Sequence, residues 1–257
     1  MEGDGKVRAA LIIIGNEILS GRTQDANLAF IAKELNSVGV TLAEVRVIPD
    51  VEAEIIETVN TLRERFAYVF TTGGIGPTHD DITAECVAKA FGKALIRNVE
   101  AVGLIEARAR EMGREINEAR LRMANTPEGS TLIRNSISAA PGFQIENVYV
   151  LAGVPVVMQV MLAEVTPALT GGSPTLSRAV TSRVSEGIMA DGLTALQNDY
   201  PNIDVGSYPF YKPGGIFGTT IVMRYTDADA LDKAAEDVAA LMRSHGGEPE
   251  FRDTADD

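Results

Sequence analysis

Three apolar segments, each followed by a helical pattern, constrain the fold of this chain more than any other feature. Residues 7–14 form a nearly unbroken run of apolar and β-branched side chains, which is typical of a strand buried on both faces of a parallel sheet. Residues 41–48 and 67–72 have the same character. Because single helices separate the three segments, the pattern predicts parallel β-α-β crossovers and an α/β fold, a three-layer α/β/α sandwich with a mainly parallel sheet.

The chain is expected to divide at residues 170–175, a polar stretch with two glycines and a proline. We expect a first domain over residues 7–170. Residues 176–250 follow a β-α-β-β-α order, which predicts a small α+β C-terminal domain of split β-α-β type. A packing or dimerisation role suits this domain at least as well as ligand binding, and we expect a homo-oligomer. The further elements expected in the first domain are helices at 81–91, 98–124 and 154–169 and short strands at 129–134 and 143–151.

The composition excludes several classes of function. With a formal net charge of −13, the chain lacks the clustered Lys and Arg that binding to nucleic acid or to an anionic membrane surface requires. Cys86 is the single cysteine, so an internal disulfide framework is excluded, and its place in an expected helix favours a buried apolar role over a nucleophilic one. No apolar run approaches the roughly 18 residues that a membrane span needs. We therefore expect a cytoplasmic protein with neither nucleic-acid nor membrane partners.

A glycine-rich loop follows the third apolar segment, where residues 69–83 read VFTTGGIGPTHDDIT. Gly73, Gly74 and Gly76 allow backbone amides to approach a ligand, and the positive end of the following helix attracts anions. A purely steric turn would use the same glycines. Asp80 and Asp81 favour ligand binding, because two carboxylates beside a phosphate would repel it unless a divalent cation bridges them. Their alternative role, helix capping, needs only one aspartate.

Polar residues also follow the first two strands. Gly15, Asn16 and Glu17 come after the first strand and Asp50 after the second. Because the carboxyl ends of parallel strands share one edge of a sheet, we expect these residues to converge on the glycine loop. Two structural roles stay open, Asp50 as the N-cap of its helix and Asn16 as a bridge across a turn.

The motifs of the commonest hydrolases are missing. The sequence contains no Gly-x-x-x-x-Gly-Lys-Ser/Thr, no Gly-x-Ser-x-Gly and no Cys/His cluster at zinc spacing. His79 could assist proton transfer, although an exposed loop histidine is the simpler interpretation, and His245 is assigned to the surface. Metal-assisted chemistry on a phosphate is the class that remains.

Residues 71–83 resemble the signature of the molybdopterin-binding (MoaB/Mog-like) superfamily. Their Gly-Pro-Thr-x-Asp-Asp form is similar to that of its competence/damage-inducible protein A (CinA) branch. Residues 15–21, together with Asp25 and Asn27, resemble the first motif of that branch, and Asp50 stands where the superfamily keeps an acid. The resemblance is strong over residues 7–170 and implies the three-layer domain already expected.

The resemblance extends to later turns and has departures. Residues 140–143 and 153–155 match turns of the family, and residues 206–209 resemble the small domain that follows in CinA proteins and in FAD synthases. Asn16 replaces a common Asp, and Val156 follows Val-Pro where the branch usually has Glu, so an acid expected at the pocket rim is missing. The sequence does not include the amidohydrolase domain of full-length CinA, so deamidation of nicotinamide mononucleotide is not implied.

The resemblance implies a small-molecule nucleotide or pterin ligand. In CinA-like proteins the corresponding activity is metal-dependent cleavage of a pyrophosphate, as in ADP-ribose, and the FAD synthase module is similar in hydrolysing FAD. We therefore expect a metal-dependent pyrophosphatase that acts on ADP-ribose or a related nucleotide such as FAD, with Mg²⁺, Mn²⁺ or Co²⁺ as its cofactor. One alternative is a molybdopterin-binding protein or adenylyltransferase of molybdenum cofactor biosynthesis, and another is a non-catalytic nucleotide-binding regulatory module.

These hypotheses assign roles to individual residues. Asp50, Asp81 and Glu17 are the expected catalytic residues, and Asp81, Asp50 and Asp80 are the expected ligands of the cation. The residues expected to bind phosphate or nucleotide are Thr72, Gly73, Gly74, Gly76, Thr78, Gly15, Asn16, Asn27, Pro141 and Gly142.

Overall fold

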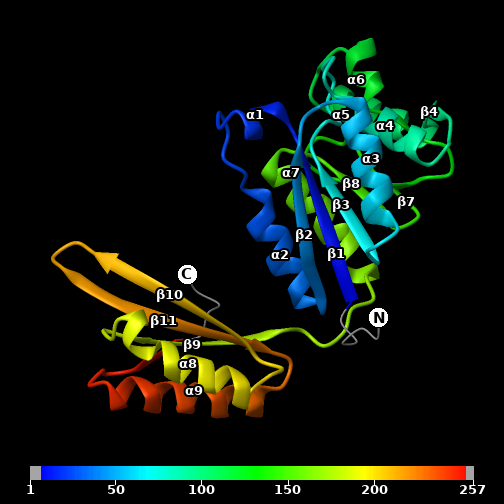
Figure 1. Ribbon diagram of the computed structural model, residues 1–257. Coiled ribbons are helices and arrows are strands. Elements are labelled where there is room, and N and C mark those ends of the chain that lie inside the picture. The colour runs from blue at the N-terminus through cyan, green and yellow to red at the C-terminus, as the bar shows by residue number, and fades with distance from the viewer. Residues whose placement is uncertain (1–6, 253–257) are drawn as a thin grey trace. The chain divides into compact units, whose positions relative to one another are not determined.

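The computed structural model describes residues 7–252 of the chain, which forms two compact units that meet in sequence between Gly172 and Ser173 (Figure 1). The first unit contains a six-stranded sheet in the order β2-β1-β3-β8-β7-β6. The strands β2, β1, β3 and β8 run parallel, whereas β7 and β6 add two antiparallel strands at one edge. The strands of this sheet are β1 (Val7–Ile14), β2 (Val40–Ile48), β3 (Tyr68–Thr72), β6 (Thr131–Ile133), β7 (Gly142–Ile145) and β8 (Val148–Leu151).

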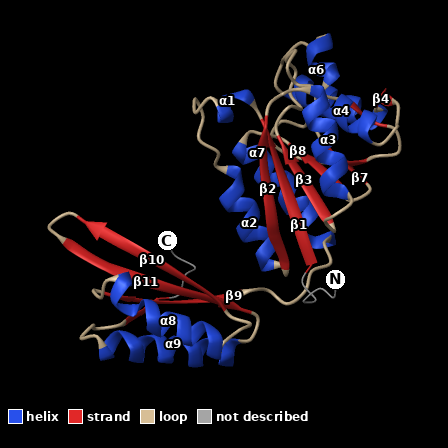
Figure 2. Ribbon diagram, viewed as in Figure 1, coloured by secondary structure: helices blue, strands red, loops and turns tan. Residues whose placement is uncertain are grey.

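Helices cover both faces of this sheet, so the predicted three-layer α/β/α sandwich is confirmed (Figure 2). One apolar core packs α2 and α7 against one face, and a second core packs α3 and α4 against the other. Cys86 of α4 lies fully buried in the second core, as predicted. The helices of these layers and of the adjoining loops are α1 (Asn16–Leu19), α2 (Asn27–Ser37), α3 (Glu52–Arg63), α4 (Thr83–Ala90) and α7 (Pro155–Val165), which continues into the short 3-10 turn η1 (Thr166–Ala168).

The predicted long helix at residues 98–124 is wrong. The segment forms α5 (Val99–Glu111) and α6 (Glu118–Arg122), separated by a turn in which Gly113 has a φ of +60°. A glycine in this left-handed conformation ends a helix readily, and the Asn117 side chain starts the next one by accepting a hydrogen bond of 3.0 Å from the Arg120 N–H. The sequence did not predict the strands on either side of this segment, β4 (Leu95–Arg97) and β5 (Asn125–Pro127). They pair antiparallel and so bring the two ends of the segment together.

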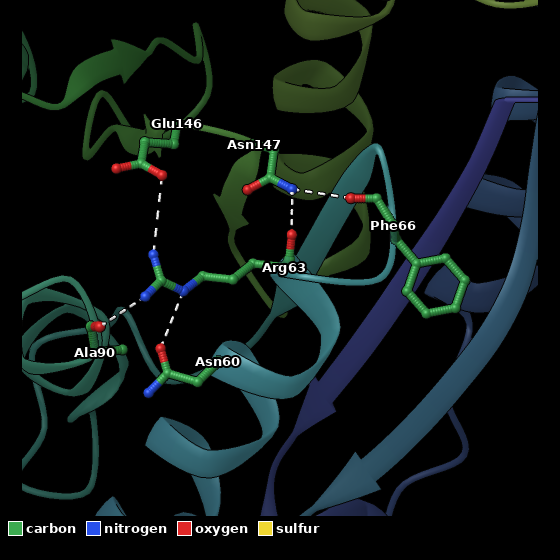
Figure 3. A network of polar contacts seen from close by, with 6 residues as sticks. All are labelled: Asn60, Arg63, Phe66, Ala90, Glu146 and Asn147. Atoms are coloured by element: carbon green, nitrogen blue, oxygen red, sulfur yellow. Dashed lines mark hydrogen bonds and ion pairs between the residues drawn. The ribbon is translucent and has the colours of Figure 1, made fainter.

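The turn between β7 and β8 is hydrogen-bonded to the segment that connects α3 with β3. The Asn147 side-chain amide donates hydrogen bonds of 2.9 Å to the carbonyls of Arg63 and Phe66, in the connection that leads into β3 (Figure 3). The Arg63 guanidinium donates to Asn60 and to the carbonyl of Ala90. The network therefore ties α3, α4 and the β7–β8 turn together at the amino ends of β3 and β8, away from the glycine loop.

The last residues of the first unit pack closely on the turn before β2. The N–H of Gly172 donates to the Gly39 carbonyl at 2.9 Å, and a Cβ on Gly39, which has a φ of +73°, would lie 1.8 Å from the Gly172 carbonyl oxygen. The Thr170 N–H donates to the Tyr68 hydroxyl at 2.9 Å. Contacts within the first unit thus extend to the position at which the second unit begins.

The second unit is a β-α-β-β-α-β domain with an antiparallel sheet in the order β10-β11-β9-β12. The helices α8 and α9 pack their apolar side chains against this sheet. The sequence predicted each element except β12, which is short and exposed. In the described residues no helix is long and apolar enough to cross a membrane. The elements are β9 (Leu176–Ser182), α8 (Glu186–Asp199), β10 (Asp204–Lys212), β11 (Ile216–Tyr225), α9 (Ala228–Ser244) and β12 (Glu250–Arg252).

Candidate functional site

The carboxyl ends of β1, β2, β3 and β8 meet at one edge of the first unit's sheet. The Gly15 N–H, just after β1, donates to the Ile48 carbonyl at the end of β2 at 3.1 Å. The Gly73 N–H, just after β3, donates to the Leu151 carbonyl at the end of β8 at 3.3 Å. The end of β1 is therefore joined to the end of β2, and the end of β3 to the end of β8, at the edge that the parallel topology predicted.

The first two glycines of the loop are required by its packing. Gly73 and Gly74 have φ values of +102° and +68°. A Cβ on Gly73 would lie 2.2 Å from the Ile14 carbonyl oxygen, and one on Gly74 would lie 2.1 Å from Oγ1 of Thr83. Thr83, the buried first residue of α4, donates to both glycine carbonyls, through Oγ1 at 3.1 Å and through its N–H at 3.0 Å. These two glycines shape the turn, so they alone do not identify a ligand site.

Gly76 instead makes room for a carboxylate. A Cβ on Gly76 would lie 2.7 Å from Oδ2 of Asp81. That oxygen accepts hydrogen bonds from the Thr78 N–H, at 2.8 Å, and from the Thr78 hydroxyl. Asp81 does not cap α4, whose N-cap residue is Ile82. Because both hydrogen bonds end on Oδ2, the carboxylate is held in one orientation, and its Oδ1 accepts none from the described part of the chain.

Asp50 holds the loop after β1. Its Oδ2 accepts a hydrogen bond of 2.9 Å from the Asn16 N–H. It does not cap α3, whose N-cap residue is Val51, so that alternative is wrong. Glu17, in α1, is exposed, and its carboxylate lies so close to Gly15 that a Cβ there would be 2.5 Å from Oε1. The carboxylates of Asp50 and Glu17 and the backbone N–H of Asn16 thus lie just after the ends of β1 and β2.

Asp80 and His79 lie on the outside of the glycine loop. The His79 side chain is 97% exposed and lies 4.0 Å from Oδ1 of Asp80. The polar groups around its carboxylate, the Thr78 side chain first and then its own backbone N–H, lower the pKa of Asp80, which is therefore ionised at neutral pH. The exposure of His79 agrees with the simpler interpretation of this histidine, and Asp80 faces solvent beside it.

Several residues that the sequence predicted to bind the ligand instead pack within the protein and hold the loops in place. The Thr72 side chain is buried in the sheet. Asn27, buried at the start of α2, donates through its side-chain amide to the Gly153 carbonyl at 2.8 Å. Gly153 in turn packs on Gly73, since a Cβ on it would lie 3.2 Å from the Gly73 Cα. Gly142 allows β7 to approach β8, because its Cβ would lie 2.3 Å from the Val150 carbonyl oxygen.

A pocket of about 90 Å³ opens between the glycine loop and the segment that carries α6. Its lining includes Gly74 and Gly76 of the glycine loop and the polar residues Asp81, Arg122 and Asn125. Such a volume suits a phosphate-sized group more than a whole dinucleotide, because pockets for drug-sized ligands reach roughly 300–1,000 Å³. The buried Pro141 and Phe143, at the start of β7, and the α4 residues Ala84 and Glu85 belong to the same lining, together with Ile75, Leu95 and Met123.

Arg122 is the basic residue of this pocket, and the sequence did not predict it there. The segment around it is rich in Arg and Glu, which is typical of a solvated helix face, and most of its charged residues fit that interpretation. Arg97 pairs with Glu118 and Arg108 with Glu111, at 3.1 and 3.2 Å. Arg122 makes no ion pair with the described residues. Arg122 lies three residues before β5. The pairing of β4 with β5, which the sequence did not predict, brings this part of the chain to the glycine loop, so a prediction of that pairing would have identified Arg122.

The donor set does not form a preassembled metal cage. Among the described residues no group of three or more His, Cys, Asp or Glu side chains is close enough to bind a metal ion. Asp81 lines the pocket, whereas Asp50 is not part of its lining. One or two carboxylates suffice for Mg²⁺ when phosphate oxygens and water complete its coordination. The residues therefore fit a cation that is shared with a phosphorylated ligand.

A mainly parallel sheet with an anion-sized pocket at the carboxyl ends of its strands defines the class, an α/β protein that binds a small molecule. Residues 10–171 match the model of a probable molybdopterin binding domain, and residues 174–248 match that of the middle domain of FAD synthase. The chain therefore belongs to the MoaB/Mog-like molybdopterin-binding superfamily, as a CinA-type member. The two matches together indicate a nucleotide-related, CinA-like function.

Individual relatives agree with this placement. A protein of Archaeoglobus fulgidus is 32% identical over 90% of this chain and 96% of its own length. A CinA-like protein of Geobacter metallireducens is 33% identical, and the match covers 94% of this chain and 60% of that protein. The crystal structure of CinA from Thermoplasma acidophilum, a protein described as having unknown function, is 32% identical with a TM-score of 0.59 and covers 64% of this chain and 99% of its own.

Proposed function

We propose that the chain hydrolyses the pyrophosphate bond of ADP-ribose or of a related nucleotide such as FAD, with a divalent cation. The observation that carries this proposal is a single pocket whose lining brings Gly74 and Gly76 together with an acid, Asp81, and a base, Arg122. A site for a neutral ligand would not need an unpaired arginine, and a site for an anion alone would not place a carboxylate beside it.

Arg122 supplies the positive charge that a pyrophosphate requires. The chain carries a net charge of −13, so its general field repels anionic ligands. A guanidinium binds phosphate oxygens through two parallel hydrogen bonds, which fixes the orientation of the group as well as its position. We therefore assign Arg122 to phosphate binding and to the stabilisation of charge on the leaving phosphate.

Asp81 is the residue assigned to the cation and the attacking water. Thr78 holds one carboxylate oxygen, so the other can face the pocket without a change of rotamer. Asp50, with Glu17 nearby, presents a second acidic position at the neighbouring strand ends. A bound divalent cation would lower the pKa of a coordinated water and neutralise charge on the phosphates. Water adds across the P–O–P bond, so ADP-ribose gives AMP and ribose 5-phosphate, and FAD gives AMP and FMN.

The decisive experiment incubates the protein with ADP-ribose, FAD and NAD in the presence of Mg²⁺, Mn²⁺ or Co²⁺ and separates the products by chromatography. We expect AMP with the wild type and loss of turnover, by roughly a hundredfold or more, in Asp81→Asn and Asp81→Ala. Both variants should keep a cooperative thermal transition. An unchanged rate in either would remove Asp81 from the mechanism, and no product with any metal would remove hydrolysis.

Arg122 has a matched control on the same helix. Arg120 carries the same charge, but its guanidinium donates to the Glu115 carbonyl at 3.2 Å and does not line the pocket. Arg122→Ala should lower kcat/KM about tenfold or more, Arg122→Lys should recover part of the loss, and Arg120→Ala should change little. Equal losses in Arg120→Ala and Arg122→Ala would mean that only the general charge matters.

A second candidate function is binding of a pterin in molybdenum cofactor synthesis. The match of residues 10–171 to a probable molybdopterin binding domain favours it. A thermal-shift screen with ADP-ribose, FAD and a pterin separates the two functions. Stabilisation by the pterin alone, without turnover of any pyrophosphate, would replace the hydrolase by this second function.

A further inference from the structure

The second unit contains a pocket of its own. It has a volume of about 740 Å³, within the range of roughly 300–1,000 Å³ that is usual for small-molecule sites. It lies where β9 ends, in a region without a recognisable sequence motif. Its lining comes from the β10–β11 hairpin, the start of α8, the turn after α9 and β12.

The sheet itself creates this hollow. β11 pairs with β9 only as far as Thr219, opposite Ser182, whereas its pairing with β10 continues to Ile216, opposite Lys212. The hairpin therefore extends beyond the end of β9 (Figure 1). The turn after α9 bounds the hollow, because a Cβ on Gly247 would lie 2.3 Å from Oγ of Ser182.

Positive charge is concentrated around the hollow. Residues 173–257 contain seven Lys and Arg against fourteen Asp and Glu, yet Arg183, Lys212 and Arg252 all line this pocket, together with His245. Arg252 pairs with Glu250 at 3.2 Å, and Glu248 is the other acid of the lining. Arg183 and Lys212 form no ion pair with the described residues. The Lys212 ammonium lies over the Phe210 ring, 5.4 Å from its centroid, so its charge is not neutralised by an acid. Two cations without an acidic partner favour an anionic ligand, even in an acidic unit.

The start of α8 adds to this preference. Ser185 is the N-cap residue of this 14-residue helix, but its side chain makes no capping hydrogen bond. The Ile188 N–H donates to the Ser185 carbonyl at 3.2 Å, but the Ser185 side chain leaves the N–H groups of Glu186 and Gly187 available. Ser185 lines the pocket next to Arg183. The one acid of the first turn, Glu186, accepts a hydrogen bond from the Ser207 hydroxyl.

Apolar side chains of the same pocket offer a surface for a ring. Phe217 is 47% exposed and stacks on Tyr211, with 6.4 Å between the ring centroids. Ile188 of α8, which also lines the pocket, is 58% exposed. An exposed aromatic ring within a cationic pocket is the combination that binds a planar base and a phosphate together.

We propose that this pocket binds a mononucleotide, with its phosphates on Arg183, Lys212 and the start of α8 and its base on Phe217 and Ile188. The site belongs to the second unit alone. It does not depend on the hydrolytic function proposed for the glycine loop, and binding there would give the chain a second nucleotide site.

The chain contains no tryptophan, so Phe217→Trp creates a specific fluorescent reporter that retains an aromatic surface. Titration of the full-length variant with ADP should change the emission of Trp at this position in a saturable way. Adding Arg183→Gln and Lys212→Gln should weaken the apparent affinity about tenfold or more, because two charge-assisted contacts are lost. The matched control removes two charges of the same unit that lie outside the pocket, with Lys233→Gln and Arg243→Gln, and should leave the affinity unchanged.

Three further arms complete the test. Inorganic phosphate and adenosine should each bind much more weakly than ADP, and Arg122→Ala in the first unit should leave the fluorescence titration unaltered. The single variants Arg183→Gln and Lys212→Gln replace the pair if the double variant loses its cooperative melting transition. The proposal fails if ADP produces no saturable signal, if the signal survives both substitutions, or if phosphate binds as well as ADP.

Discussion

Asp50 and Asn16, which are 34 positions apart in the sequence, are joined by a hydrogen bond of 2.9 Å from the Asn16 backbone N–H to the Asp50 carboxylate. This bond couples the loop after β1 to the loop after β2. It gives Asp50 a structural role in the free protein in addition to the chemical role proposed for its charge, and the two roles can be separated by mutation.

Asp50→Asn keeps an oxygen acceptor for the Asn16 N–H but removes the charge, whereas Asp50→Ala removes both. We expect Asp50→Ala to lower the free energy of unfolding by about 1 kcal/mol and Asp50→Asn to lower it less. Both should reduce pyrophosphate turnover, because the charge is lost in each. Chemical denaturation and product analysis provide the two measurements, and a wild-type rate in Asp50→Asn would limit Asp50 to holding the loop.

Val156→Glu restores the acid that the family resemblance places after Val-Pro. Val156 is 55% exposed in the first turn of α7, where a carboxylate is favoured by the helix dipole, so the fold should be unaffected. We expect the divalent cation to bind more tightly, so that the metal concentration for half-maximal turnover decreases about tenfold. Val156→Gln is the control of the same size. An equal gain in both variants would exclude a charge effect.

Asn147→Ala tests the network in Figure 3 at the opposite end of the sheet. Loss of its two hydrogen bonds leaves the carbonyls of Arg63 and Phe66 without this partner, and we expect a destabilisation of about 1–3 kcal/mol. Affinity for ADP-ribose in the folded protein should not change, because the network lies away from the glycine loop. A change in affinity without a change in stability would contradict this division.

Cys86 provides a prediction about pH. Burial raises the pKa of its thiol to about 11, compared with about 8.5 in an unfolded chain. Between these two values the unfolded chain releases the thiol proton while the folded protein retains it. The free energy of unfolding is therefore unaffected by this thiol below about pH 8.5 and decreases as the pH rises above that value. At pH 8 we expect alkylation of Cys86 by iodoacetamide only after denaturation. Mass spectrometry measures it, and rapid labelling of the native protein would disprove the burial.

The sequence predicted the three-layer fold because apolar, β-branched strands and amphipathic helices alternate without interruption in the first 91 residues. It failed between residues 98 and 124, where Arg and Glu continue a helical pattern across Gly113 and conceal a turn. The edge strand β12 is too short and too polar to give a periodic signal. Local patterns therefore sufficed wherever a whole element is buried on one face.

The site was predicted in outline for the same reason. Parallel topology places Gly15, Asp50 and Gly73 at one edge whatever their side chains do. Topology does not determine the rotamer of a side chain. The hydrogen bonds from the Thr78 N–H to Asp81 and from the Asn16 N–H to Asp50 could therefore not be predicted. Arg122 reaches the pocket only through the pairing of β4 with β5, a long-range contact between two three-residue strands.

The close packing of Gly172 on Gly39 has a practical consequence for dissecting this molecule. Because the Gly172 N–H donates within its own half, a chain that stops there would lose no hydrogen bond of that half. A stop before Thr170 would instead remove the hydrogen bonds between Thr170 and the Tyr68 hydroxyl. Limited proteolysis between the halves should accordingly release an amino-terminal fragment that survives intact and retains the glycine loop and its pocket.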